Sequence, residues 1–140
     1  MPSPLDNLVA IGKLKAEAPA QDELDGLMHS GSVRIKDAEN EALSLESRFD
    51  LAYNAAHAFS LAALRFRGYR SDNRYLVFQT LQQTVGLSAS EWLVLDDAHK
   101  KRNKAEYEGD ADISSALVTA VIRVGREVER RVDALGAIPS

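Results

Sequence analysis

The residues best suited to chemistry lie between positions 96 and 107 of this 140-residue chain. They recur mostly three or four residues apart, which places them on one side of a helix. The stripe consists of Asp96, His99, Arg102, Asn103, Glu106 and Tyr107. A guanidinium binds anions, and an imidazole exchanges protons near neutral pH. The stripe is therefore a candidate catalytic site, and the alternative is a solvated helix face joined by ion pairs.

A second polar stripe interrupts an otherwise apolar segment. Asp50, Asn54 and His57 follow one another at spacings of four and three. A polar group packed inside a bundle costs about 1–3 kcal/mol if it lacks a partner. We therefore expect a buried structural network whose partner is Arg102 or Asn103, and a ligand pocket is the alternative.

A third candidate combines arginines with aromatic residues between positions 65 and 75. Its members with a possible role in nucleic-acid binding are Arg65, Arg67, Tyr69, Arg70 and Arg74. Arginines bind phosphates and aromatic rings stack on unpaired bases. The same residues also suit a helix C-terminus, where cations complement the helix dipole.

Helices are the elements that must position these residues. Prolines occur only at positions 2, 4, 19 and 139, and the long stretch between the last two is rich in helix-forming residues. We expect helices at about 5–15, 22–43, 45–67, 74–85, 89–107 and 113–135. Ser44 and Asp112 are expected caps, Ser88 and Glu91 form a capping box, and Gly26 and Gly31 predict a kink.

This pattern predicts an all-α fold. The short connections favour an up-down antiparallel bundle of four to five main helices plus a short N-terminal helix. We expect residues 1–19 to form an N-terminal arm with the short helix and residues 20–138 to form the bundle. The segment from Phe49 to Leu64 is apolar almost all round, so its helix should lie at the centre.

Composition restricts the function further. The formal net charge is −4, whereas proteins that coat nucleic acid by charge alone are usually basic. There is no cysteine, and the three histidines lack the spacing of a metal site, so we expect neither a metal nor another cofactor. No apolar run could span a bilayer and no secretory signal is visible, so we expect a cytoplasmic protein without membrane contact.

Two blocks of the sequence resemble the HEPN family (higher eukaryotes and prokaryotes nucleotide-binding), most closely a small bacterial branch often labelled hypothetical or DNA-binding. The first block, residues 47–58, reads SRFDLAYNAAHA, and the second, residues 99–109, reads HKKRNKAEYEG. The resemblance covers about residues 21–135. It implies a bundle of four or five helices that commonly forms a homodimer.

Many HEPN proteins are metal-independent ribonucleases, including toxins of toxin–antitoxin pairs. Their signature is an arginine followed after four to six residues by a histidine. Here Arg102 and Asn103 match its start, but Tyr107 stands where a histidine is expected and no histidine follows His99. Because tyrosine has an unperturbed pKa near 10, it is a poor base. The resemblance thus implies a degenerate motif, in which His99 or Glu106 would have to act in place of the missing histidine.

Three functions therefore stay open. The chain could bind or cleave RNA, or it could be a non-enzymatic interaction module that pairs with an antitoxin or a nucleotidyltransferase. It could also be a small-ligand-binding bundle lined by Asp50, Asn54, His57 and Arg102. Whether it is an enzyme at all is left open at this stage.

Overall fold

Helices form nearly all of the regular structure. The structure is a computed structural model, and it describes residues 3–109 and 112–139. Its elements are α1 (Pro4–Ala10), β1 (Lys15–Ala16), α2 (Gln21–Ala38), α3 (Leu45–Phe66), β2 (Tyr69–Arg70), α4 (Arg74–Gln79), α5 (Leu81–Thr84), α6 (Ala89–Glu108) and α7 (Ser115–Leu135). The prediction of an all-α helical bundle is confirmed.

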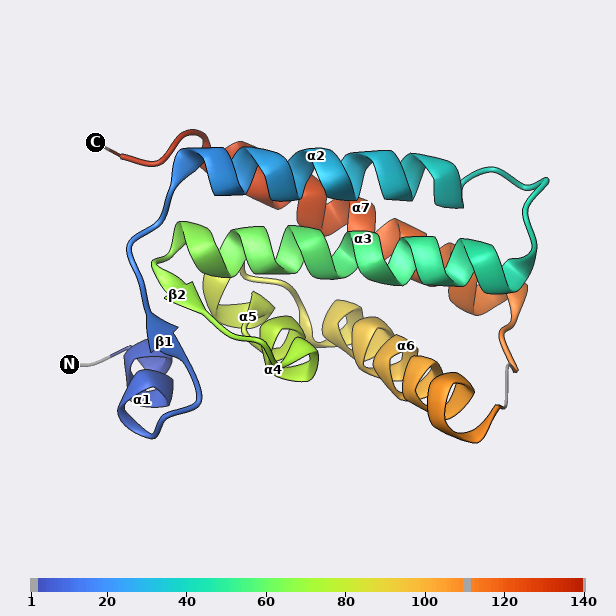
Figure 1. Ribbon diagram of the computed structural model, residues 1–140, viewed down its shortest axis with the longest axis horizontal. Coiled ribbons are helices and arrows are strands. Elements are labelled where there is room, and N and C mark those ends of the chain that lie inside the picture. The colour runs from blue at the N-terminus through green and yellow to red at the C-terminus, as the bar shows by residue number, and fades with distance from the viewer. Residues whose placement is uncertain (1–2, 110–111, 140) are drawn as a thin grey trace.

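The four long helices follow an up-down course (Figure 1). Helix α2 packs antiparallel to α3, and α6 leads back antiparallel to α7. Helices α3 and α7 run in the same direction and also pack closely on each other. This order leaves α4, α5 and α6 on one side of α3 and α2 on the other, so α3 contacts elements from both sides.

Local capping chemistry explains most helix starts. The hydroxyl of Ser44 accepts a hydrogen bond from the backbone N–H of Ser47, at 3.1 Å, and so caps α3 as predicted. Ser88 and Glu91 form the predicted capping box at the start of α6. The prediction for α7 is wrong by two residues, because the cap is Ser114 and the expected cap, Asp112, precedes it.

Three other boundary predictions differ from the structure. Helix α1 is shorter than expected, and α2 ends at Ala38, before a loop at residues 39–44. The expected helix at about 74–85 is divided at Thr80. The hydroxyl of Thr80 donates to the carbonyl of Val77, at 2.8 Å, which offers the backbone a local alternative to a continuous helix.

The expected kink in the second helix is absent. Helix α2 is continuous through Gly26 and Gly31. A methyl group at Gly31 would lie only 2.4 Å from the ring of Phe59, and one at Gly125 would lie 2.7 Å from Ile35. These glycines let α2, α3 and α7 approach closely, so their role is steric.

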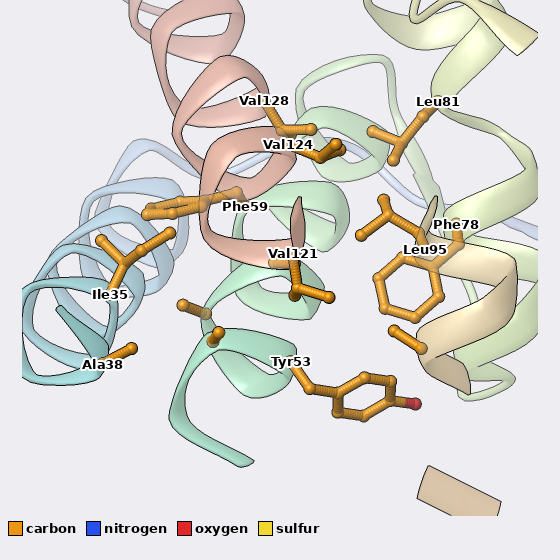
Figure 2. Packing of buried hydrophobic residues seen from close by; sticks show 14 of the residues in the cluster. Ile35, Ala38, Tyr53, Phe59, Phe78, Leu81, Leu95, Val121, Val124 and Val128 are labelled. Carbon is orange, nitrogen blue, oxygen red and sulfur yellow. The ribbon is translucent and has the colours of Figure 1, made fainter. Parts of the chain in front are cut away.

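Helix α3 is the centre of the core, as predicted. Its residues Tyr53, Phe59 and Leu64 are fully buried, among many small alanines. Figure 2 shows Phe59 and Tyr53 among side chains from neighbouring helices, including Ile35 and Val121. The hydroxyl of Tyr53 extends away from the labelled apolar residues.

The N-terminal segment is attached to the bundle by a small strand pair and an apolar cluster. Strand β1 pairs antiparallel with β2, and Ala16 lies opposite Tyr69. Leu5 and Leu14 pack against Leu64 of α3 and Val77 of α4. The sequence did not predict these strands, because two residues are too few to show an alternating pattern. In the described part of the chain, no helix combines the length and apolarity needed to cross a membrane.

Candidate functional site

Tyr53 of α3 connects the two polar stripes. Its ring is fully buried, and its hydroxyl lies 3.0 Å from Nδ1 of His99 on α6. Its pKa is raised above the usual value, chiefly because burial disfavours the phenolate, so the hydroxyl keeps its proton. Sequence reasoning assigned Tyr53 to the apolar core only. Its position between the polar residues Asp50 and His57 was the one sequence feature that could have indicated a role in the site.

Two arginines from different helices stack on the Tyr53 ring. The guanidinium carbon of Arg74, on α4, lies 5.5 Å from the ring centroid, and that of Arg102, on α6, lies 5.4 Å from it. Cations at this distance are attracted by the ring quadrupole. The structure therefore brings Arg74, a member of the third sequence candidate, together with Arg102 of the first.

The side chains around each arginine differ. Arg74 donates from Nη1 to Oδ1 of Asn54, at 2.8 Å, and Asn54 in turn donates to the backbone carbonyl of Asp50. The partner of Asn54 is thus Arg74, and the expectation of Arg102 or Asn103 is wrong for this residue. Arg102 pairs with Glu106 at 3.3 Å, and its side chain is 30% exposed.

His99 lies in a hydrogen-bonded chain. Its Nδ1 faces the Tyr53 hydroxyl, and its Nε2 lies 3.2 Å from Nδ2 of Asn103. Burial lowers the pKa of His99, the positive charge of Arg102 lowers it further, and the nearby Asp96 raises it in part. The imidazole is therefore neutral at pH 7, with both nitrogens facing protein partners. We call Tyr53, Asn54, Arg74, His99, Arg102 and Asn103 the Tyr53 cluster.

His57 is a second neutral imidazole beside this cluster. Its ring packs edge-on against Phe78, with centroids 6.0 Å apart. Burial lowers the pKa of His57 to about 4, and the charges of Arg74 and Arg102 act in the same direction. The site thus combines two guanidinium cations with two uncharged imidazoles, so the two arginines supply the positive charge that an anion would meet there.

A groove opens beside Arg102, between the first turns of α3 and the last turns of α6. Its volume is about 470 Å³, and its lining includes Asp50, Arg102 and Glu106. Asp50 is exposed there and so does not join a buried network, contrary to expectation. The apolar part of the lining comes from Phe49, Ala105 and Ile113.

The remaining residues of the first stripe lie at the edges of the site. Asp96 is 8% exposed, and its Oδ2 pairs with Lys100 at 3.0 Å. Its Oδ1 is buried without a hydrogen-bond partner among the described residues. Tyr107, which occupies the expected histidine position, is 81% exposed and lies one turn beyond Asn103. Tyr107 is therefore a surface side chain.

Most of the third sequence candidate has a structural role. Arg65 is 1% exposed, and it contacts Glu23 at 2.6 Å and Glu17 at 3.3 Å. It also donates to the carbonyls of Glu17, Ala18 and Tyr69. Arg70 pairs with the same two carboxylates. We call Glu17, Glu23, Arg65 and Arg70 the arm clasp, because it joins β1 and α2 to the end of α3.

Arg67 and Tyr69 are likewise engaged with the protein itself. Arg67 donates from Nη2 to the carbonyl of Thr84, at 2.8 Å, and the Tyr69 hydroxyl donates to Asp6 at 2.5 Å. Since the guanidinium of Arg65 is buried and fully occupied, it is not on a surface that a nucleic acid can reach. Of the five residues in this candidate, Arg74 is the one that joins the Tyr53 cluster.

The site contains no obvious metal centre. Within residues 3–109 and 112–139, no group of three or more histidine or carboxylate side chains could hold a metal ion. Comparison with models of protein families gives no match, and a search of curated proteins gives none either. The functional interpretation therefore depends on the geometry of the site and on the sequence blocks that form it.

Proposed function

We propose that this chain is a HEPN-like domain that binds single-stranded RNA through the Tyr53 cluster, with a degenerate ribonuclease motif. One observation carries the proposal: Arg74 and Arg102, from separate helices, converge on the ring of Tyr53. Paired guanidinium groups suit a phosphate, since each presents several N–H donors in a fixed plane. The two sequence blocks that resemble HEPN proteins supply Tyr53, His99, Arg102 and Asn103.

Binding without efficient cleavage fits the histidines of the site. Attack by a ribose 2′-hydroxyl requires a group within hydrogen-bond reach that accepts its proton. Both nitrogens of His99 face protein groups, Tyr53 and Asn103, so this imidazole is not free to accept that proton. Any residual cleavage would use His99 after Asn103 moves away and would not require a metal.

The proposal is tested by binding of a fluorescently labelled single-stranded RNA at low salt, followed by anisotropy. We expect wild-type protein to bind, and Arg102→Ala and Arg74→Ala each to weaken binding at least about tenfold, as for a lost charge-assisted contact. Arg123→Ala, an exposed arginine of α7, is the matched control and should leave affinity unchanged. Absence of binding by the wild type would exclude the proposal.

Cleavage is tested separately with the same RNA. We expect little turnover by the wild type, and we expect any turnover to persist with EDTA and to disappear in His99→Gln. Loss of turnover with EDTA but not in His99→Gln would contradict the assignment of His99.

A second candidate is a protein-interaction module, including a homodimer or a complex with a cognate antitoxin or nucleotidyltransferase. It is favoured by the large exposed apolar side chains of α6, since Leu93 is 56% exposed and Tyr107 is 81% exposed. Light scattering on the purified chain tests self-association. A monomer at micromolar concentration would count against the homodimer, and Leu93→Asp should dissociate a dimer that uses this face.

A further inference from the structure

A second groove lies between α1, α4, α5 and α6. Its volume is about 360 Å³. Three glutamines, Gln79, Gln82 and Gln83, contribute to its lining together with Trp92. None of the described residues that line it is charged. A carboxamide offers both donors and an acceptor, so glutamines can pair with either kind of group on a nucleobase edge.

Trp92 gives this groove an aromatic wall. It is the only tryptophan in the chain and is partly exposed. Its indole N–H is buried and has no hydrogen-bond partner among the described residues. Because Trp92 lines the groove and is partly exposed, its ring is available for a stacking contact.

A continuous row of aromatic rings connects the groove to the Tyr53 cluster. The ring of Trp92 lies 6.1 Å from that of Tyr75, edge to face, and Tyr75 lies 5.5 Å from His99. His99 contacts Tyr53, on which both arginines stack. Leu76 and Gln79 of the groove lining also lie on the same short helix as Arg74, so the groove and the proposed phosphate site are neighbours on α4.

The two grooves differ in charge. The groove beside Arg102 contains the carboxylates of Glu46, Asp50 and Glu106, which repel the phosphates that accompany a base. The groove beside Trp92 has no charged residue in its described lining and contains an aromatic ring, and unpaired bases stack on aromatic side chains. A strand held at Arg74 therefore meets less repulsion if its neighbouring base enters the groove beside Trp92.

We propose that this groove is a subsite for an unpaired nucleobase of the RNA strand whose phosphate is bound by Arg74 and Arg102. The base stacks against Trp92 and pairs along its edge with Gln79 and Gln82. This inference rests on the proposed RNA binding. It extends the proposed binding site to a groove that no sequence motif indicated.

The single tryptophan allows a direct test. An unlabelled single-stranded RNA of mixed sequence is titrated into the protein while Trp92 fluorescence is recorded. A strand of equal length that carries abasic sites keeps the phosphates but lacks bases. We expect the intact strand to quench the fluorescence, and we expect the abasic strand to quench it much less and to bind at least about fivefold more weakly, as for one lost stacking contact.

A variant pair makes the test independent of fluorescence. The double variant Gln79→Ala/Gln82→Ala removes amides from the groove, and Gln21→Ala, at the start of α2, is the matched control. We expect the double variant to bind labelled RNA about fivefold or more weakly in anisotropy and the control to bind like wild type.

The outcomes separate the two proposals. Normal anisotropy binding with equal quenching by both strands, or with no effect of the double variant, would overturn the base subsite and leave RNA binding intact. No anisotropy change with any strand would overturn RNA binding and the subsite with it.

Discussion

The Tyr53 cluster and the arm clasp both contain two arginines, yet their partners differ. In the clasp, Arg65 and Arg70 share the carboxylates of Glu17 and Glu23. In the cluster, Arg74 and Arg102 stack on a neutral ring. Arg74 also contacts a neutral amide, and within the described residues Arg102 alone of the two has a carboxylate partner, the half-exposed Glu106.

This difference separates a structural role from a binding role. A guanidinium whose charge is balanced by two carboxylates, as in the clasp, has little electrostatic attraction left for a ligand. A guanidinium that faces an uncharged ring keeps its field, and the lowered pKa values of His57 and His99 partly result from that field. Substitutions in the arm clasp should therefore lower stability, and substitutions of the arginines in the Tyr53 cluster should weaken RNA binding.

The largest expected effect is at the clasp. Arg65→Ala removes a buried guanidinium and leaves the carbonyls of Glu17, Ala18 and Tyr69 without their donor, so we expect a loss of about 3–5 kcal/mol in the free energy of unfolding. Urea denaturation measures it. Arg70→Ala, whose side chain is 32% exposed, should cost less than about 1 kcal/mol.

If Arg65→Ala does not fold, the stability of Arg65→Lys is measured in its place, because lysine keeps the positive charge but lacks the planar guanidinium group. We expect it to be folded and less stable than wild type. If Arg65→Ala were as stable as wild type, the clasp would have no structural role.

The second effect is a pH dependence due to His57. Its folded pKa of about 4 lies below the unperturbed value of 6.5, so the unfolded chain binds the proton more readily. Stability is therefore full above pH 6.5 and falls as the pH drops toward 4. Between pH 7 and pH 5 we expect a loss of about 1–2 kcal/mol from this group.

Urea denaturation at the two pH values measures this loss. His57→Gln should remove the part of the dependence that this imidazole causes and leave the part due to His99, whose pKa burial also lowers. His29→Gln, at an exposed position of α2, should retain both parts. An unchanged pH dependence in His57→Gln would show that His57 is not held neutral by its surroundings.

A smaller effect is expected at the hydroxyl of Tyr53. Tyr53→Phe keeps the ring beneath both arginines but removes the hydrogen bond to His99, so we expect a loss of about 1 kcal/mol in stability. RNA affinity should change little, because the guanidinium groups retain their stacking surface. Calorimetric unfolding and anisotropy give the two values. A loss of RNA binding as large as in Arg102→Ala would show that the hydroxyl itself contacts RNA.

The smallest effect concerns Glu106. Its ion pair with Arg102 is partly exposed, so Glu106→Gln should change stability by no more than about 0.5 kcal/mol. RNA affinity should increase slightly, since a carboxylate that competes with phosphate for Arg102 is removed. Glu129→Gln, in a comparable pair with Arg126, should leave affinity unchanged. Weaker RNA binding by Glu106→Gln would indicate that Glu106 contacts the ligand directly.

The fold was predictable where local chemistry and packing agree. Ser44, Ser88 and Glu91 mark helix starts by their own hydrogen bonds, and the apolar surface of residues 49–64 requires a central helix. The division at Thr80 and the uninterrupted α2 were not predictable, because they depend on a side-chain hydrogen bond and on Phe59, which is distant in sequence from Gly31.

The candidate site was predictable only in part. Helical spacing predicted that His99 and Arg102 lie on one side of their helix, and both side chains reach Tyr53. The buried network predicted for Asp50 does not include it, because Asp50 is exposed. It could not show that Arg74 would join them, because Arg74 reaches Tyr53 only through the packing of α4 on α3. Nor could composition distinguish Arg65 from Arg74, since the difference lies in Glu17 and Glu23, more than 40 residues away.

The most direct test of the central claim is the salt dependence of RNA binding. For single strands, the logarithm of the binding constant falls against the logarithm of the salt concentration by about 0.7 for each phosphate contact. We predict that Arg74→Ala and Arg102→Ala each reduce this slope by about 0.7, whereas Arg70→Gln of the arm clasp leaves it unchanged. Equal slopes for wild type and both cluster variants, or a reduction only in Arg70→Gln, would contradict the assignment of the Tyr53 cluster as the phosphate site.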